Sequence, residues 1–166
     1  MELSEAKEKF IQAWGGFGSQ WGINRSMAQV HALLLVSTDP LSTEDVMDRL
    51  NISRGNANMN LRALIDWNLV RRVLRQGERR EFFEAEKDVW KIATQIIRER
   101  KKRELEPMVM LLNELKQISG STKETKAFRE LTADLHDLTG RLDGVLEKST
   151  RRDVQWFLKA ASTLMR

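Results

Sequence analysis

The sequence predicts a mainly α-helical fold that carries one small β-hairpin. Apolar residues recur at steps of three and four along most of the 166-residue chain, which is the period of an amphipathic helix. Two short extended runs flank a basic, glycine-containing turn at residues 75–80, which is the pattern of a hairpin. Hydrophobic residues make up 41% of the chain and charged residues 31%, so it can bury a core.

The composition excludes several classes of function. With no Cys, no Tyr and 2 His, the chain lacks the means for disulfide frameworks and cysteine nucleophiles, and little remains for acid–base catalysis. No apolar run approaches the ~20 residues of a membrane helix, and the N-terminus lacks the form of a secretory signal. We therefore expect a cytoplasmic protein without membrane association that is not an enzyme and uses no cofactor or metal ion.

The first predicted helix covers residues 3–21. Its apolar stripe is strongly aromatic and consists of Leu3, Ala6, Phe10, Trp14, Phe17 and Trp21. Gly15, Gly16 and Gly18 weaken the second half, because each glycine costs on the order of 1 kcal/mol against alanine. They predict either a kink or a close backbone contact at that point.

Three further helices are expected between residues 26 and 67. The helix at 26–37 is apolar on most sides, which predicts burial, and it stops before the boundary signal Asp39-Pro40. Ser42 caps a short helix that runs to residue 50, and Ser53 caps a helix at 54–67. That last helix turns Ala57, Leu61, Leu64 and Ile65 inward, and Asn68 suits a left-handed terminator.

Residues 69–74 and 81–85 then predict two strands joined by the basic turn. Beyond residue 88 a helix to about 118 is interrupted by the charged run RERKKRELE and by Pro107, which should kink or restart it. A helix around residues 128–145 repeats apolar residues every 3.5 positions, as a coiled-coil seam does, and a final helix covers about 152–165.

This order predicts three regions: an N-terminal dimerisation helix at 1–24, a compact domain at 25–92 and a helical dimerisation region at 93–166. We expect homodimer contacts from Phe10, Phe128, Leu131, Leu135, Leu138, Leu142, Val145 and Phe157. The alternative is that the seam packs within the helical bundle of one chain.

Positive charge is concentrated in the middle of the chain. Residues 51–103 carry 14 Lys and Arg against 7 Asp and Glu, whereas residues 1–50 carry 4 against 7 and residues 104–166 carry 10 against 10. Such a distribution favours a polyanionic partner for the middle segment, and a solvated basic face is the alternative.

Helix, short helix, turn, helix and basic hairpin is the order of a winged helix-turn-helix, so the predicted partner is double-stranded DNA. In the helix at 54–67 we expect Gly55, Asn56, Met59, Asn60 and Ala63 to face outward, where asparagine amides can pair with adenine. Arg79 or Arg80 is the residue expected in the minor groove and Arg75 is expected on phosphate. The full predicted DNA contact set is Ser53, Arg54, Gly55, Asn56, Met59, Asn60, Arg62, Arg75, Arg79 and Arg80.

Each of these patterns has an alternative interpretation. The helix could be an ordinary polar surface helix, and the strand arginines could protect a sheet edge from aggregation. A winged-helix module whose basic wing contacts an acidic protein partner is the competing function. A small-molecule enzyme built on helices is a third, and the missing active-site constellation argues against it.

Residues 10–92 resemble the GbsR branch of the MarR-type transcriptional regulators. The resemblance is carried by SRGNANMNLRAL, DWNLVRRV and GERREFFEAEKDVWKI. It implies that the first of these contains a recognition helix and that GERRE is the tip of a wing. Two features depart from the family pattern: Asn68 stands where glycine is usual, and the strand EFFEAE lacks the tyrosine that relatives often carry.

The resemblance also implies regulation of osmoprotectant uptake or synthesis, with choline or glycine betaine as a candidate effector. Quaternary ammonium groups bind over aromatic faces, so the expected effector site consists of Trp14, Phe17, Trp21, His31 and Trp90. The alternative is that these aromatic residues serve core and dimer packing.

A homodimer would place its two recognition helices ~34–36 Å apart on a pseudo-palindromic operator.

Overall fold

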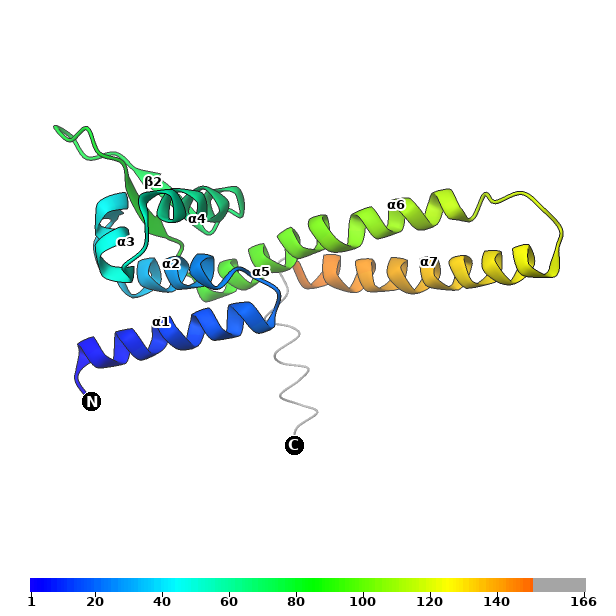
Figure 1. Cartoon of the computed structure of the whole chain (residues 1–166), viewed down its shortest axis with the longest axis horizontal. Coiled ribbons are helices and arrows are strands. Elements are labelled where there is room, and N and C mark those ends of the chain that lie inside the picture. The colour runs from blue at the N-terminus through cyan, green and yellow to red at the C-terminus, as the bar shows by residue number, and fades with distance from the viewer. Residues whose placement is uncertain (151–166) are drawn as a thin grey trace. The chain divides into compact units, whose positions relative to one another are not determined.

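Figure 1 shows the computed structural model, which describes residues 1–150. The chain divides after Ile92 into two compact units, Met1–Ile92 and Ala93–Arg166. Within the described residues the protein is mainly helical and has one small antiparallel sheet, which confirms the predicted fold class. The helix expected at 152–165, and with it Phe157, lies outside the described residues.

The first unit is built around α2 (Arg25–Val36), which contacts α1 (Leu3–Gln20), α4 (Arg54–Asp66) and β3 (Phe82–Ala85). Seven of its twelve residues are buried, which confirms the burial expected from its nearly continuous apolar run. The helix α3 (Thr43–Leu50) packs against α4. The core includes Val30 and Leu34 of α2 and Leu61 and Leu64 of α4, each at most 2% exposed.

The sheet has three strands, where two were predicted. β2 (Val70–Val73) pairs with β3, and β3 also pairs with the short β1 (Leu41–Ser42) in the order β1-β3-β2. Leu41 lies opposite Phe83, and Val73 lies opposite Phe82. β1 could not be predicted, because two residues are too few to show the alternation of a strand. It anchors the hairpin to the helices, since an isolated two-stranded hairpin is only marginally stable.

The glycines of α1 allow a close helix contact and no break. The helix continues from Leu3 to Gln20. A Cβ atom added to Gly18 would lie 2.6 Å from the Cβ of Ala28, and one added to Gly15 would lie 2.6 Å from Cγ of Gln29. At Gly16 the same atom would meet nothing within 4 Å. The close contact between α1 and α2 therefore depends on Gly15 and Gly18, and α1 is not interrupted there.

The predicted caps of the middle helices are confirmed. Ser42 accepts from the Asp45 N–H while the Asp45 carboxylate accepts from the Ser42 N–H, so the two residues form a capping box at the start of α3. The hydrogen bond from the Ser42 hydroxyl is the main reason that the pKa of Asp45 is lowered. Asn68 adopts the left-handed conformation expected of it, with φ 54°.

The second unit contains the end of α5 (Val89–Arg100), the π-helical segment η1 (Lys101–Leu105), α6 (Glu106–Leu115) and α7 (Lys123–Thr150). η1 lies within the charged run predicted to interrupt the helix, and Pro107 lies in the first turn of α6. An ion pair of 3.1 Å joins Lys101 to Asp143 of α7. No described helix is long and apolar enough to span a membrane.

The apolar seam of α7 is left partly uncovered. Leu131, Leu138 and Val145 are each more than half exposed, although α6 packs along the same helix. The two other leucines of the seam, Leu135 and Leu142, are 41% and 48% exposed. The contact between α6 and α7 therefore does not account for the whole apolar surface of α7.

Candidate nucleic-acid interface

The helix α4 starts from a capped turn and exposes its first residues. Ser53 accepts a hydrogen bond of 3.2 Å from the Asn56 N–H, which satisfies one of the free donors at the helix start. Arg54, Gly55, Met59 and Arg62 are exposed, whereas the face containing Ala57, Leu61 and Leu64 is buried, as expected. A Cβ atom added to Gly55 would meet nothing within 4 Å, so the surroundings of this residue are open.

The predicted outward position of Asn60 is wrong. Asn60 is only 2% exposed, and its Nδ2 donates to the backbone oxygen of Asn56 at 3.0 Å. The physical reason is position: residues 57, 60, 61 and 64 form a complete i, i+3, i+4, i+7 stripe on the inner face of a helix. The amide is tolerated inside because it has hydrogen-bond partners. Of the two asparagines, Asn56 is the partly exposed one.

The guanidinium of Arg54 is held by a carboxylate from the preceding helix. Its Nη1 lies 2.8 Å from Oε1 of Glu44, and both side chains are well exposed. The pKa of Glu44 is lowered, first by a hydrogen bond from its own backbone N–H and then by the one from Arg54. The side chain of Arg54 therefore has a preferred direction at the start of α4. A phosphate bound there would compete with Glu44 for the guanidinium of Arg54.

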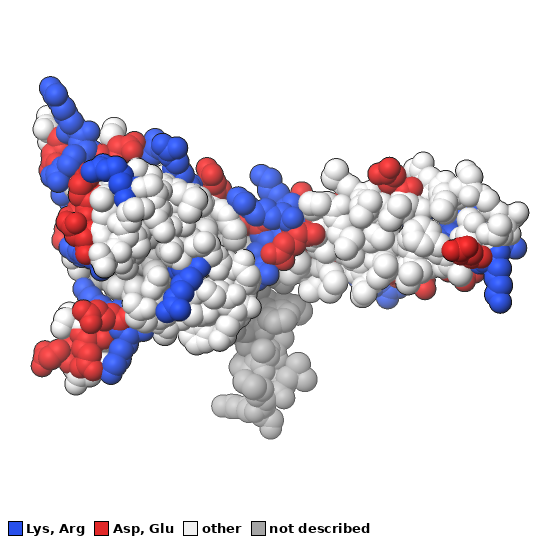
Figure 2. Space-filling view, in the orientation of Figure 1, with Lys and Arg blue, Asp and Glu red and all other residues white. Residues whose placement is uncertain are grey.

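The hairpin carries less net positive charge than residues 71–80 alone suggest. Glutamates as far along the chain as residue 84 offset the charge of its arginines. Ion pairs join Arg71 to Glu84 at 2.9 Å and Arg72 to Glu81 at 3.3 Å. In Figure 2 acidic and basic side chains lie next to one another around the base of the hairpin. Counting along the sequence to residue 80 leaves out both of these carboxylates.

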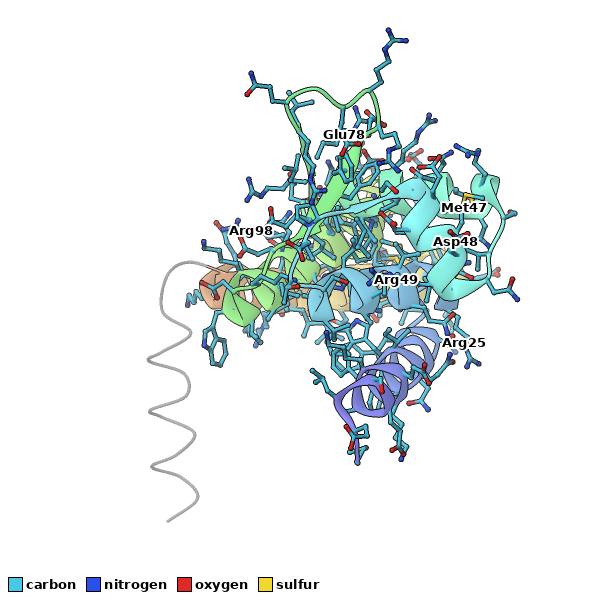
Figure 3. The ribbon with its side chains drawn as sticks, turned by 90° about the vertical axis from the view of Figure 1, so that its left-hand side faces the viewer. Arg25, Met47, Asp48, Arg49, Glu78 and Arg98 are labelled. Carbon is cyan, nitrogen blue, oxygen red and sulfur yellow. The ribbon has the colours of Figure 1, made fainter. Side chains whose placement is uncertain are left out.

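The arginines near the turn differ in their partners. Arg80 pairs with Glu78 at 2.9 Å, and Figure 3 places Glu78 on the hairpin, beyond the helices and away from α1. Arg75 lies over the ring of Phe82, 4.2 Å from its centroid, and donates to the Pro40 carbonyl at 3.4 Å. Arg79 is exposed and has no hydrogen-bond or ion-pair partner among the described residues.

Two functional candidates in the hairpin were missed by sequence reasoning. Phe82 is 3% exposed, and its ring lies under both Arg75 and Arg80, the latter at 5.5 Å. Leu74 directly follows β2 and is 93% exposed, although its side chain is apolar. An aromatic residue following a cluster of arginines is a signal for the first of these. No sequence signal distinguishes the second from a strand residue that packs inward.

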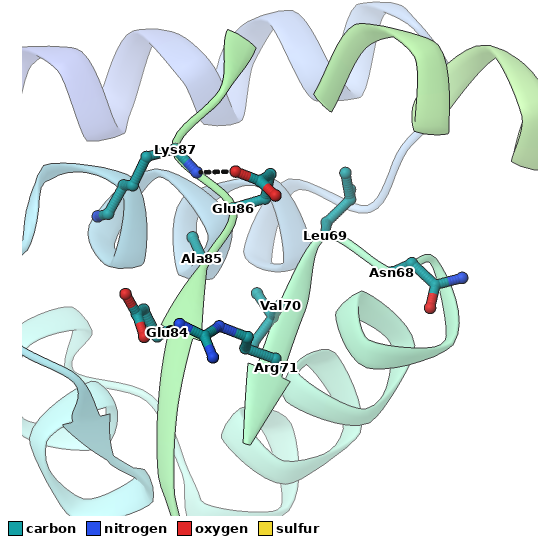
Figure 4. Close-up of a pocket in the computed structure, with 8 residues that line it drawn as sticks. All are labelled: Asn68, Leu69, Val70, Arg71, Glu84, Ala85, Glu86 and Lys87. Atoms are coloured by element: carbon teal, nitrogen blue, oxygen red, sulfur yellow. Dashed lines mark hydrogen bonds and ion pairs between the residues drawn. The ribbon is translucent and has the colours of Figure 1, made fainter. Parts of the chain in front are cut away.

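A cavity of about 340 Å³ lies beside the sheet, where β2 begins and β3 ends (Figure 4). Its lining includes Asn68, Arg71 and Glu84 and none of the residues predicted for an effector. Next to it, the ammonium group of Lys87 donates to three carbonyl oxygens at the end of α2, those of Leu34, Leu35 and Ser37, at 2.6–2.8 Å. Lys87 therefore caps α2, and its positive charge interacts favourably with the negative end of the helix dipole.

The five predicted effector residues are not brought into one site. Trp14 stacks on Phe10 at 5.4 Å and faces the His31 ring at 6.2 Å. Phe17, Trp21 and Trp90 are 60%, 63% and 50% exposed. Of the five residues, Trp14 and His31 are thus in ring contact, and the other three present their aromatic side chains to solvent.

The buried His31 should make the folded state sensitive to acid. Burial, and secondly the charge of Lys87, lower its pKa from 6.5 to about 4. Because the unfolded chain binds the proton first, stability is full above pH 6.5 and is lost as the pH falls from 6.5 towards 4, by a total of about 3 kcal/mol.

We expect His31→Leu to remove this part of the pH dependence. The variant also removes Nε2, a buried nitrogen without a hydrogen-bond partner, so it should fold. Chemical denaturation at pH 7.5 and pH 4.5 checks this. The wild type should lose about 2–3 kcal/mol more than the variant over that interval, and equal losses would contradict the assignment.

The chain is similar to known proteins in sequence and in fold. Residues 21–81 match the MarR family. The HTH-type transcriptional repressor GbsR of Bacillus subtilis (strain 168) is 23% identical over 112 residues, and the match covers 68% of this chain but only 62% of that protein. A crystal structure of a transcriptional regulator, 21% identical, has the same fold with a TM-score of 0.66 over 90% of this chain and 99% of the other. The match to the MarR family thus covers the segment that contains α2, α3, α4 and β2.

Proposed function

We propose that the protein is a cytoplasmic transcriptional regulator that binds specific sequences of double-stranded DNA as a homodimer. The observation that carries the proposal is the polarity of α4. Its exposed surface begins with a capped N-terminus, Arg54 and Gly55, and ends at Asp66, whose charge would repel phosphate. A recognition helix enters the major groove by its N-terminal end. The match to the MarR family, and the name of the Bacillus subtilis relative, support the same function.

The wing is proposed to contact DNA chiefly through Arg79. The neighbouring Arg80 is engaged with Glu78, and Arg75 is engaged with Phe82 and Pro40. A free guanidinium at a hairpin tip can enter the minor groove or pair with a phosphate without first breaking an ion pair.

Arg79→Ala should therefore weaken binding to duplexes of any sequence. The slope of the logarithm of the binding constant against the logarithm of the salt concentration should fall by about 1, because one phosphate contact is lost. Titration at several salt concentrations measures this slope. Arg72→Ala is the matched control, since Arg72 is paired with Glu81 and lies farther from the turn. An unchanged slope for Arg79→Ala would contradict the assigned contact.

The homodimer is proposed from the apolar surface left open on α7 and α1. Phe128 is 39% exposed and Phe10 is 37% exposed, and both lie on stripes whose other members are also partly exposed. Exposed apolar stripes of this kind mark association sites. Two-fold pairing would give two recognition helices and hence a pseudo-palindromic operator.

A small-molecule effector is the last part of the proposal, and it is supported by the resemblance to GbsR and by Trp14. The half-buried indole of Trp14 lies between Phe10 and His31. A quaternary ammonium ligand such as choline or glycine betaine binds best over an indole face. Titration of either compound into the protein–DNA complex tests this part by the release of DNA.

A further inference from the structure

Two asparagines one turn apart on α4 form a local hydrogen-bond network. Nδ2 of the buried Asn60 donates to the backbone oxygen of Asn56 at 3.0 Å and also to its side-chain Oδ1. The Asn56 N–H donates to the Ser53 hydroxyl. Three polar groups of Asn56, namely its N–H, its C=O and its Oδ1, are therefore already engaged within the helix.

The network also determines which way the amide of Asn56 is turned. A backbone carbonyl can only accept, so Asn60 must present its NH₂ group to the carbonyl of Asn56. The same NH₂ group faces the side chain of Asn56, and two NH₂ groups at hydrogen-bonding distance would repel. Oδ1 of Asn56 must therefore point towards Asn60, which leaves the NH₂ group of Asn56 on the other side of its amide plane.

That NH₂ group is available to an external partner. Nδ2 of Asn56 has no hydrogen-bond partner among the described residues. His31 Nε2 is the one buried side-chain nitrogen or oxygen in the described part of the chain that lacks a partner, so Nδ2 of Asn56 is open to solvent. It stands beside the exposed Gly55 and Met59, on the surface that the proposed function assigns to DNA.

We propose that Asn60 is a positioning residue that fixes Asn56 as a hydrogen-bond donor to DNA. The inference rests on the proposed function and names the base edge that this site recognises. A freely rotating asparagine pairs with adenine by donating to N7 and accepting from N6. With Oδ1 turned towards Asn60, Asn56 presents its NH₂ group outward, so it favours guanine, which offers the acceptors N7 and O6, and thymine, which offers O4. Adenine offers N7 alone, next to the N6 donor that an outward Oδ1 would be needed to accept from. Asn56 disfavours cytosine, whose amino group is a donor.

The first measurement is made on the free protein and needs no DNA. In NMR spectra we expect the side-chain NH₂ protons of Asn60 to exchange slowly with water and those of Asn56 to exchange fast. The Asn60 signals should shift in Asn56→Ala, and they should not shift in Asn58→Ala. Asn58 is a matched control because it lies in the same helix and bonds Thr43 instead. Fast exchange of both amides would overturn the positioning role whatever the protein binds.

The second measurement identifies the base preference. Duplexes bound by the wild type are selected from a random pool, and the position that loses discrimination in Asn56→Ala is then tested with all four base pairs. We expect the wild type to prefer guanine or thymine over cytosine there by about tenfold. In Asn60→Ala the Asn56 amide can turn, so the affinity for the duplex with adenine at this position should rise by a similar factor. Asn60→Ser keeps a donor for the Asn56 carbonyl but cannot reach Oδ1, and it should behave like Asn60→Ala.

The outcomes separate the two proposals. If the wild type binds every duplex equally, the proposed function fails and the base preference fails with it. If the wild type selects a sequence but Asn60→Ala and Asn60→Ser keep its profile unchanged, the positioning role of Asn60 is wrong and the proposed function stands. Circular dichroism of each variant establishes that it is folded, and Asn58→Ala should keep the wild-type profile throughout.

Discussion

Replacing Leu135 and Leu138 together with glutamate should convert the protein to a monomer and weaken its binding to DNA by a hundredfold or more. Both leucines belong to the α7 seam and are 41% and 53% exposed within one chain, so the double variant should still fold. In a dimer, four carboxylates would be buried in an apolar contact, which is strongly unfavourable. Losing the second half-site contact removes the gain of ~10²–10⁴ that linked binding provides.

Sedimentation equilibrium and DNA titration measure the two effects on the same samples. Ala133→Glu with Gly140→Glu is the matched control, because it adds the same charge to exposed positions of α7 that lie outside the seam. This control should remain dimeric. A wild-type protein that is monomeric at micromolar concentration would contradict the proposal. The same is true of a Leu135→Glu, Leu138→Glu variant that stays dimeric.

The second large effect concerns the contact between α1 and α2. Gly18→Ala should lower the free energy of unfolding by about 1–3 kcal/mol, because the new methyl group would lie 2.6 Å from the Cβ of Ala28. A Cβ atom cannot rotate away, so the helices must separate. At Gly15 the opposing atom belongs to the flexible Gln29 side chain, and alanine there should cost less.

Gly16→Ala is the control and should have the opposite sign. The new methyl group meets nothing within 4 Å, and alanine stabilises a helix interior by ~0.5–1 kcal/mol relative to glycine. Urea denaturation of the three alanine variants and the wild type gives the order. Equal effects of Gly16→Ala and Gly18→Ala would mean that the close contact between α1 and α2 does not form.

Local chemistry explains why the helices and their ends could be predicted. The capping box of Ser42 and Asp45 and the left-handed Asn68 each depend on residues within a few positions along the chain. The apolar members of the inner face of α4 followed from spacing alone, and the order of elements predicted the fold class that the structure confirms. The stretch quoted for the family resemblance overlaps the region that matches the MarR family.

The errors occurred where a residue's partner decides its role. Asn60 was assigned to the surface by its polarity, but its partner Asn56 lies one turn away and lets it remain inside. β1 exists only because β3 lies beside it. The arginines of the hairpin appear equivalent in the sequence, and they differ because Glu78, Glu81 and Glu84 pair with some of them, whereas Arg79 has no partner in the part of the chain that the structure describes.

The sequence by itself thus determined the fold class, the helix ends and the segment proposed to contact DNA, because helical period, capping and charge content are local properties of a chain. Tertiary structure alone decided which amide is buried, which arginine is free and which α1 glycines support a helix contact. Those outcomes depend on atoms brought within a few ångströms by folding, and hydrogen bonds, ion pairs and steric contacts act only over such distances.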